Sequence, residues 1–413
     1  GHPSRAITCM EEVLTNHPCD TLAMKLSHGI RFILGDARGM RASVERVLPA
    51  YSTEHAGHGY LLGCHAFALE ETGDYSKAET AGRQALWMAP DDAWGLHAVA
   101  HVHDMTGNAE AGLDWLTGRE EAWSHCNNFR YHVWWHKALM HLDLGQTDTV
   151  LDLYDREIRQ DKTDDYRDIS NAASLLSRLE IEGVDVGRRW DELADLSEKR
   201  SGDGSLAFAD LHYLLSLIGG GRDEAAAGLV ARMASARASE GEAAAILADP
   251  GQRIAAGLQA FGSGSYARAW LNLRGAAPEL QRIGGSHAQR DVFTRLTIES
   301  ALLLLPSLAV AWYYAQTQGS SFAVSTELSV AIMAGGVVTA FPLLLFAIAA
   351  RKLPYSMLGF IQFLAPSIVF VLGLTVFGEE LKPVQAACFA CIWAAAAIFV
   401  WDLVARTRKP AAS

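Results

Sequence analysis

Two pairs of histidines are the side chains in this sequence with the clearest chemical potential. His97 and His101 are four residues apart in one predicted helix, and His132 and His136 repeat that spacing in the next long one. Residues four apart project from the same helix face, so each pair presents two imidazoles in one direction. If the two faces meet, four ring nitrogens could bind a metal ion.

Two other interpretations of these histidines remain open. Tryptophans accompany both pairs, which is typical of an amphipathic groove that binds a peptide or a small ligand, and buried histidines also pack with satisfied hydrogen bonds. We expect no metal and no cofactor. The candidate ligand-groove residues are Trp94, His97, His101, His132, Trp135 and His136.

No other group of residues suggests catalysis. Ser286, His287 and Asp291 lie so close in sequence that local capping is enough to explain them, and Ser286 with Gln289 is typical of a capping box that begins a helix. The run Gly219–Gly221 lacks the Lys and Ser or Thr of a phosphate-binding loop. We therefore predict that the protein is not an enzyme.

The elements that would position the histidines follow a repeating pattern. Glycines that end one amphipathic stretch and precede another recur 34 to 43 residues apart. This pattern predicts helical hairpins stacked as a solenoid, an all-α fold over residues 1–298. The recurring glycines are Gly35, Gly73, Gly107, Gly145, Gly183, Gly221 and Gly264.

Small residues in the best repeat, Ala66, Ala78 and Ala85, and the closing Pro90 are typical of tetratricopeptide repeats. Over residues 5–300 the sequence resembles the bacterial members of the tetratricopeptide repeat protein 38 family, which implies a helical scaffold without established catalytic residues. The matching strings are His17-Pro18, Phe32 to Asp36, Ala66 to Tyr75, Trp94 to His101, Trp134 to Leu142, Asp168 to Leu179, Gly183 to Gly187, Asp210-Leu211-His212 and Gly284 to Asp291.

Composition divides the 413 residues into two unlike parts. Residues 301–413 hold six Lys or Arg and four Asp or Glu, which leaves 29 basic and 43 acidic residues in the first 300. The acidic first part makes nucleic acid an unsuitable partner. The six scattered cysteines fit a reducing compartment, and Cys388 and Cys391 are expected to be hydrophobic residues without a redox role. The start at Gly1 indicates that an earlier segment is missing.

Four uncharged segments predict four transmembrane helices in residues 299–405, followed by a cytosolic tail at 406–413. With four spans the basic residues around Arg290, Arg351 and Arg406 all fall on one side, which is the cytoplasmic side by the positive-inside rule. The segments are Ser300–Thr317, Leu328–Ala350, Tyr355–Phe377 and Val384–Trp401.

The same region resembles the carboxyl-terminal part of RarD-type permeases of the drug/metabolite transporter superfamily (the EamA permeases). The resemblance rests on Leu303–Pro306, Gly336–Arg351, Leu358–Pro366, Ile392–Ala394 and Gly378-Glu379. It implies the last four of ten helices. Gln362 is the candidate pore-facing residue, with interhelical hydrogen bonding as the alternative, and Pro342 and Pro366 are expected to kink the helices.

Together these patterns predict a non-catalytic repeat scaffold fused to a partial transporter domain. The alternative is a drug/metabolite-type secondary transporter with a cytosolic repeat domain. We expect an inner-membrane, multi-pass protein with its repeat domain and carboxyl terminus in the cytoplasm. Its expected partners are membrane lipid and a protein or peptide on the repeat groove. No polar linker separates the two patterns near residue 299, so we expect a join of two unrelated units.

Overall fold

The computed structural model describes residues 2–236 and 240–317, with side chains as far as residue 305. Throughout these ranges the regular structure is helical and contains no strand, which confirms the all-α prediction in its coarse form. Contacts between residues divide the chain into two units, Gly1–Phe322 and Ala323–Ser413. Only the first unit contains described residues.

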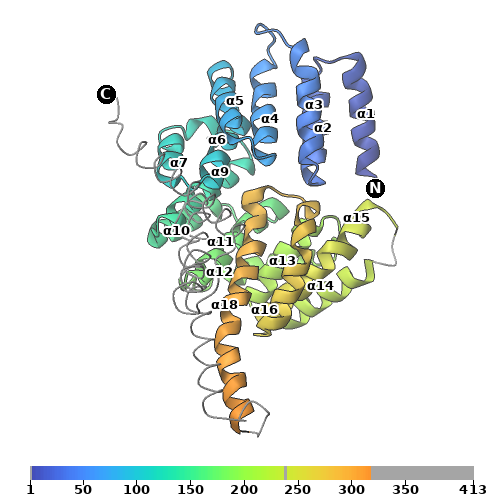
Figure 1. The fold of residues 1–413 in the computed structure, drawn as a ribbon. Coiled ribbons are helices and arrows are strands. Elements are labelled where there is room, and N and C mark those ends of the chain that lie inside the picture. The colour runs from blue at the N-terminus through green and yellow to red at the C-terminus, as the bar shows by residue number, and fades with distance from the viewer. Residues whose placement is uncertain (1, 237–239, 318–413) are drawn as a thin grey trace, which may run out of the picture. The chain divides into compact units, whose positions relative to one another are not determined.

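Most helices of the first unit are short and follow one another in hairpins, and Figure 1 shows the first of them standing side by side. The α-helices are α1 (Pro3–Asn16), α2 (Thr21–Ile33), α3 (Ala37–Val47), α4 (His58–Glu71), α5 (Tyr75–Met88), α6 (Ala93–Met105), α7 (Ala109–Leu116), α8 (Glu121–Ser124), α9 (Phe129–Asp143), α10 (Thr147–Leu153), α11 (Tyr166–Ile181), α12 (Arg189–Arg200), α13 (Ala207–Gly219), α14 (Asp223–Ser235), α15 (Glu242–Ile246), α16 (Gln252–Gly262), α17 (Tyr266–Ala276) and α18 (His287–Thr317).

All seven recurring glycines lie at the turns between paired helices and have a positive φ between 66° and 83°. In the turn from α4 to α5, Gly73 has φ +83°, and the next N–H, of Asp74, donates to the carbonyl of Leu69 at 2.9 Å. This is the Schellman end of a helix, in which only glycine adopts the left-handed conformation without strain. The glycine spacing therefore located the helical hairpins of the first unit.

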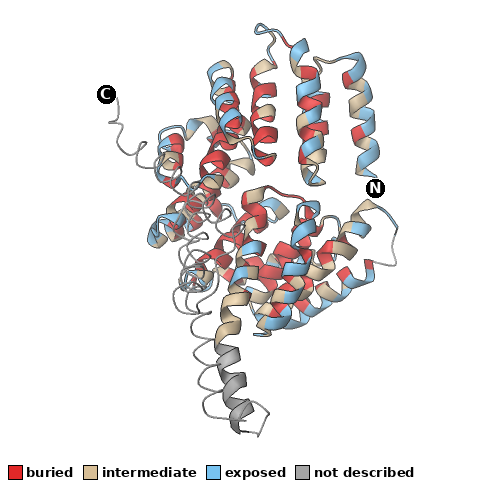
Figure 2. Ribbon diagram, viewed as in Figure 1, coloured by how far each residue is buried: buried red, intermediate tan, exposed pale blue. Residues whose placement is uncertain are grey.

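Small residues let neighbouring helices approach closely. Ala66, Ala78 and Ala85 are fully buried between α4 and its neighbours, and an added Cβ at Gly82 would lie 2.5 Å from a methyl group of Val99 on α6. Figure 2 shows buried residues concentrated along α4 and α6. One of these helices, α6, carries the first histidine pair, His97 and His101.

The last described helix, α18, packs against the preceding helix α17 and against helices from earlier in the sequence, α6, α11 and α16. Its start is the predicted capping box: the N–H of Gln289 donates to Oγ of Ser286 at 3.3 Å, and the N–H of Ser286 donates to Oε1 of Gln289 at 3.0 Å. The first turns of α18 therefore fill space against the inner helices of the first unit.

The four predicted membrane spans are not confirmed. Residues 300–317 form the end of α18, and within 2–236 and 240–317 no helix is long and apolar enough to cross a membrane. The other three segments lie outside the described residues.

Arg290, which was used to predict the membrane orientation, and the nearby Arg295 have partners inside the first unit. Arg290 is buried and pairs with Glu71 at 3.3 Å, while Arg295 pairs with Asp291 at 2.5 Å and Asp143 at 3.7 Å. They are ion-paired because this stretch of α18 packs against other helices of the first unit. That packing cannot be predicted from the order of residues in the sequence. The expected orientation must therefore rest on the basic residues around Arg351 and Arg406.

Candidate functional site

The two histidine pairs meet inside the first unit. His97 and His101 lie on α6, and His132 and His136 lie on α9. The start of α6 is fixed by Asp92, whose carboxylate accepts the N–H of Gly95 at 3.1 Å. Gly95 also allows α6 to approach α4 closely, because an added Cβ there would lie 3.2 Å from Cα of Gly63.

One nitrogen from each of the four rings faces a common point. Nε2 of His132 lies 2.9 Å from Nε2 of His97 and 3.2 Å from Nε2 of His136. Across all four histidines, one ligand atom from each lies within 4.8 Å of the others. His97, His101 and His136 are buried, and His132 is partly exposed. The two helix faces that carry the histidine pairs therefore meet.

The other ring nitrogens are held by neighbours that the sequence did not suggest. Nδ1–H of His136 donates to a carboxylate oxygen of Asp104 at 2.6 Å, and Nδ1–H of His132 donates to Oδ1 of Asn171 at 3.1 Å. Nδ1 of His101 lies 3.5 Å from a carboxylate oxygen of Glu70. Asn171 on α11 also accepts the side-chain amide of Gln289 on α18 at 3.1 Å.

Burial controls the charge of the cluster. It lowers the pKa of His97, His132 and His136 well below the usual value, so these rings are neutral at physiological pH. Burial also opposes protonation of His101, but the carboxylate of Glu70 reverses that effect and raises its pKa. Burial raises the pKa of Asp104 to about 7. Neutral imidazole is the form that binds metals.

Aromatic rings enclose the cluster. The ring of Phe67 stacks on His97 with centroids 5.6 Å apart, and Trp135 stacks on His132 at 5.3 Å. Trp94 lies 5.3 Å from His97. Of the six residues expected to line a groove, Trp94 and His132 are partly buried and the other four are buried. This burial favours a closed cluster over an open groove, because α18 packs close by.

A second polar group lies next to the histidines. Glu71 accepts the backbone N–H of His287 at 2.8 Å and pairs with the buried Arg290 at 3.3 Å. Arg178, also buried, donates to the carbonyl of Ala288 at 2.7 Å and lies 3.6 Å from Asp291. These contacts join α4 and α11 to the start of α18, which fixes the helix that supplies Gln289.

These supporting residues could hardly be predicted from the sequence. Glu70 and Glu71 resemble ordinary charges at a helix end, and Asn171 lies 118 residues before Gln289. Asp104 would have been the easiest of them to predict, because it lies three residues after His101 on the same helix. The transporter candidates Gln362, Pro342 and Pro366 lie outside the described residues.

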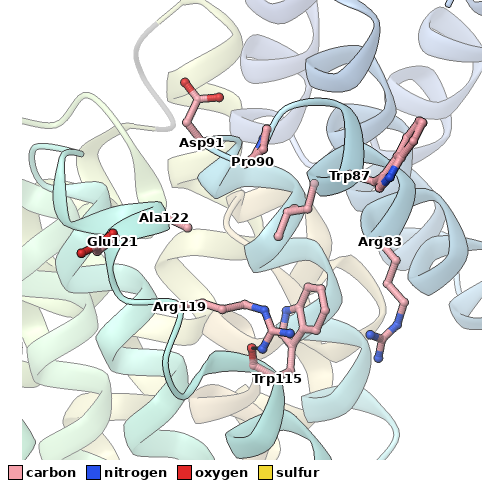
Figure 3. A pocket seen from close by; sticks show the side chains of 9 residues that line it. Arg83, Trp87, Pro90, Asp91, Trp115, Arg119, Glu121 and Ala122 are labelled. Carbon is pink, nitrogen blue, oxygen red and sulfur yellow. Dashed lines mark hydrogen bonds between the residues drawn. The ribbon is translucent and has the colours of Figure 1, made fainter.

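A surface hollow of about 670 Å³ lies apart from the cluster, among residues of α5, α7 and α8. The guanidinium groups of Arg83 and Arg119 lie 4.5 Å and 4.6 Å from the ring centre of Trp115 (Figure 3). Trp87, at its edge, is 83% exposed. Arg119 donates to the carbonyl of Trp115 at 2.7 Å and has no carboxylate partner among the described residues.

Comparison with known proteins finds relatives for part of the chain. It is 39% identical over 115 residues to Protein RarD of Streptomyces exfoliatus, and 40% identical over 116 residues to an uncharacterized transporter of Vibrio cholerae. It is also 39% identical over 118 residues to Protein RarD of Salmonella typhi. Each match covers 28% of this chain and 36 to 40% of the relative, so the chain spans well under half the length of these proteins.

No protein-family model matches the chain. These relatives support a transporter-like region, since one of them is named as an uncharacterized transporter and none of the three is named as an enzyme. The resemblance to the tetratricopeptide repeat protein 38 family stays a prediction.

Proposed function

We propose that this is a bacterial inner-membrane protein in which a transporter-related segment, residues 299–405, follows a cytoplasmic helical scaffold. The observation that carries the proposal is the 39% identity to Protein RarD over 115 residues. That length agrees with the segment in which the permease motifs and the four apolar stretches occur. Arg351, Lys352 and the basic residues from Arg406 to Lys409 favour a cytoplasmic carboxyl terminus.

Extraction at alkaline pH tests the membrane assignment. We expect the full chain to remain in the membrane pellet after a carbonate wash, because apolar segments of about 20 residues hold a protein in the bilayer. A chain that ends at Ser300 is the matched control and should be released into the supernatant. Release of the full chain under the same conditions would contradict the proposal.

Transport by this chain is the alternative function. The matched region corresponds to 36 to 40% of each relative's length, and the rest of each relative lies outside the match. We therefore expect vesicles that contain only this purified chain to show no solute uptake. Uptake that is lost in a Gln362→Ala variant would favour the secondary transporter instead.

For the first unit we propose a non-catalytic, tetratricopeptide-like scaffold that binds an acidic peptide at the hollow between α5 and α7. Arg119 offers an exposed guanidinium without a carboxylate partner among the described residues, and Trp87 offers an exposed ring elsewhere on the lining of the same hollow. Arginine and tryptophan are frequent energetic centres of interfaces.

A displayed peptide library tests this partner. We expect enrichment of acidic peptides, with binding reduced at least about tenfold by Trp87→Ala or by Arg119→Ala. Leu271→Ala, which changes an exposed side chain on α17, is the control and should leave binding unchanged. The peptide proposal fails if nothing is enriched, or if binding survives both variants.

A further inference from the structure

We propose that Nε2 atoms of His97, His101, His132 and His136 together bind one divalent transition-metal ion, with zinc as the expected occupant. The site would be a structural centre inside the first unit. It goes beyond the proposed function, which concerns the membrane segment and the peptide surface. It also departs from the sequence-based expectation of no metal, because the hydrogen-bond partners of the rings could not be predicted from the sequence.

The distances suit a tetrahedral ion. Zinc binds histidine nitrogen at about 2.0–2.1 Å, and a tetrahedron of that size places its ligand nitrogens about 3.3 Å apart. Nε2 of His132 lies 2.9 Å from that of His97 and 3.2 Å from that of His136. The full set of four ligand atoms lies within 4.8 Å. Small side-chain adjustments would therefore complete the coordination.

The partners of Nδ1 make the convergence hard to explain without a cation. When Asp104 is ionised, Nδ1–H of His136 donates to it, and with Nδ1–H of His132 donating to Asn171 both Nε2 atoms of the neutral rings carry a lone pair. The two Nε2 atoms that carry these lone pairs are only 3.2 Å apart, so the lone pairs repel each other. A metal ion between them converts this repulsion into two bonds. Such support of ligating histidines by carboxylates and amides is typical of protein metal sites.

Hydrogen bonding among the rings alone leaves acceptors unsatisfied. His97 can donate Nε2–H to His132, but this leaves Nε2 of His136 without a donor. Nε2 of His101 is buried and has no hydrogen-bond partner among the described residues. A buried polar atom without a partner destabilises the fold. One metal ion at the common point would satisfy all four nitrogens.

The charge of the ion would also be balanced. A bound dication would keep Glu70 and Asp104, which contact Nδ1 of His101 and His136, in their charged forms, and the two carboxylates would balance its charge. A buried charge is tolerated only when it is paired. Four protein ligands leave no open position for substrate, which is the pattern of a structural site and not of a catalytic one.

Metal titration of the full chain tests the proposal. The protein is purified in detergent without a polyhistidine tag, stripped with a chelator and titrated with Co²⁺ and with Zn²⁺. We expect one Co²⁺ per chain with the intense visible absorption of a tetrahedral complex, displaced by one Zn²⁺. His132→Ala with His136→Ala should weaken the affinity at least 100-fold. His17→Ala with His125→Ala, which removes two exposed histidines, is the matched control and should change it less than twofold.

A second variant distinguishes loss of metal binding from loss of the fold. Asp104→Asn keeps the size of the side chain but removes its charge, and the loss of such a supporting partner weakens metal affinity about 10- to 100-fold. Circular dichroism shows whether each variant keeps its helices.

The proposal is overturned if the wild-type chain binds no Co²⁺, or shows only the weak spectrum of an octahedral complex. It is also overturned if the His132 and His136 variant binds Co²⁺ as tightly as the wild type. Membrane extraction is measured separately, so failure here leaves the proposed function standing.

Discussion

Glu71→Ala is expected to lower the free energy of unfolding of the first unit by about 3–5 kcal/mol, because it leaves Arg290 buried without its partner. The Glu71 and Arg290 side chains are 2% and 4% exposed and lie 3.3 Å apart. Glu71 also accepts the N–H of His287, so the change removes a bond at the start of α18. Unfolding followed by circular dichroism in fixed detergent measures the loss.

The control for this prediction is an ion pair in solvent. Arg188 and Asp191 lie 2.8 Å apart, with Arg188 94% exposed. Surface pairs contribute about 0–1 kcal/mol, so Asp191→Ala should change stability little. If Glu71→Ala costs no more than Asp191→Ala, then α18 does not dock on α4 as described.

Trp135→Ala is expected to lower the free energy of unfolding by about 3–5 kcal/mol, since removal of a large buried ring leaves a cavity. The Trp135 side chain is fully buried in the core that also contains α11, and it stacks on His132. Unfolding in urea, again followed by circular dichroism, measures the effect.

Trp87→Ala is the matched control, because Trp87 is the same residue type but is 83% exposed. Surface substitutions usually change stability by less than about 0.5 kcal/mol. Equal losses in the two variants would mean that the Trp135 ring is not in the core. The same Trp87 variant also tests the peptide surface. Its effect on stability and its effect on peptide binding are measured in separate experiments.

Local patterns predicted much of the first unit. The seven glycines identify the turns because a Schellman helix end needs a left-handed residue, and this requirement is visible without knowledge of tertiary contacts. The same holds for the capping box of Ser286 and Gln289. Helix periodicity likewise placed the two histidine pairs on single faces.

Long-range packing could not be predicted in the same way. Arg290 contacts Glu71 across 219 residues, and this contact changes Arg290 from an expected surface charge to a buried one. The carboxylates and the amide behind the histidine rings depend on which helices become neighbours, and no spacing in the sequence encodes that. The choice among a metal site, a groove and packed histidines stayed open for the same reason, because nothing in the periodicity indicates that α18 packs close by.

The most direct test of the central claim is protease treatment of sealed inner-membrane vesicles that contain the chain with an epitope at each terminus. The claim is that residues 299–405 lie in the membrane and that both ends of the chain face the cytoplasm. In inside-out vesicles we expect trypsin to remove both epitopes and leave a protected membrane fragment. In right-side-out vesicles both epitopes should survive. Loss of either epitope from right-side-out vesicles, or its protection in inside-out ones, would contradict this arrangement.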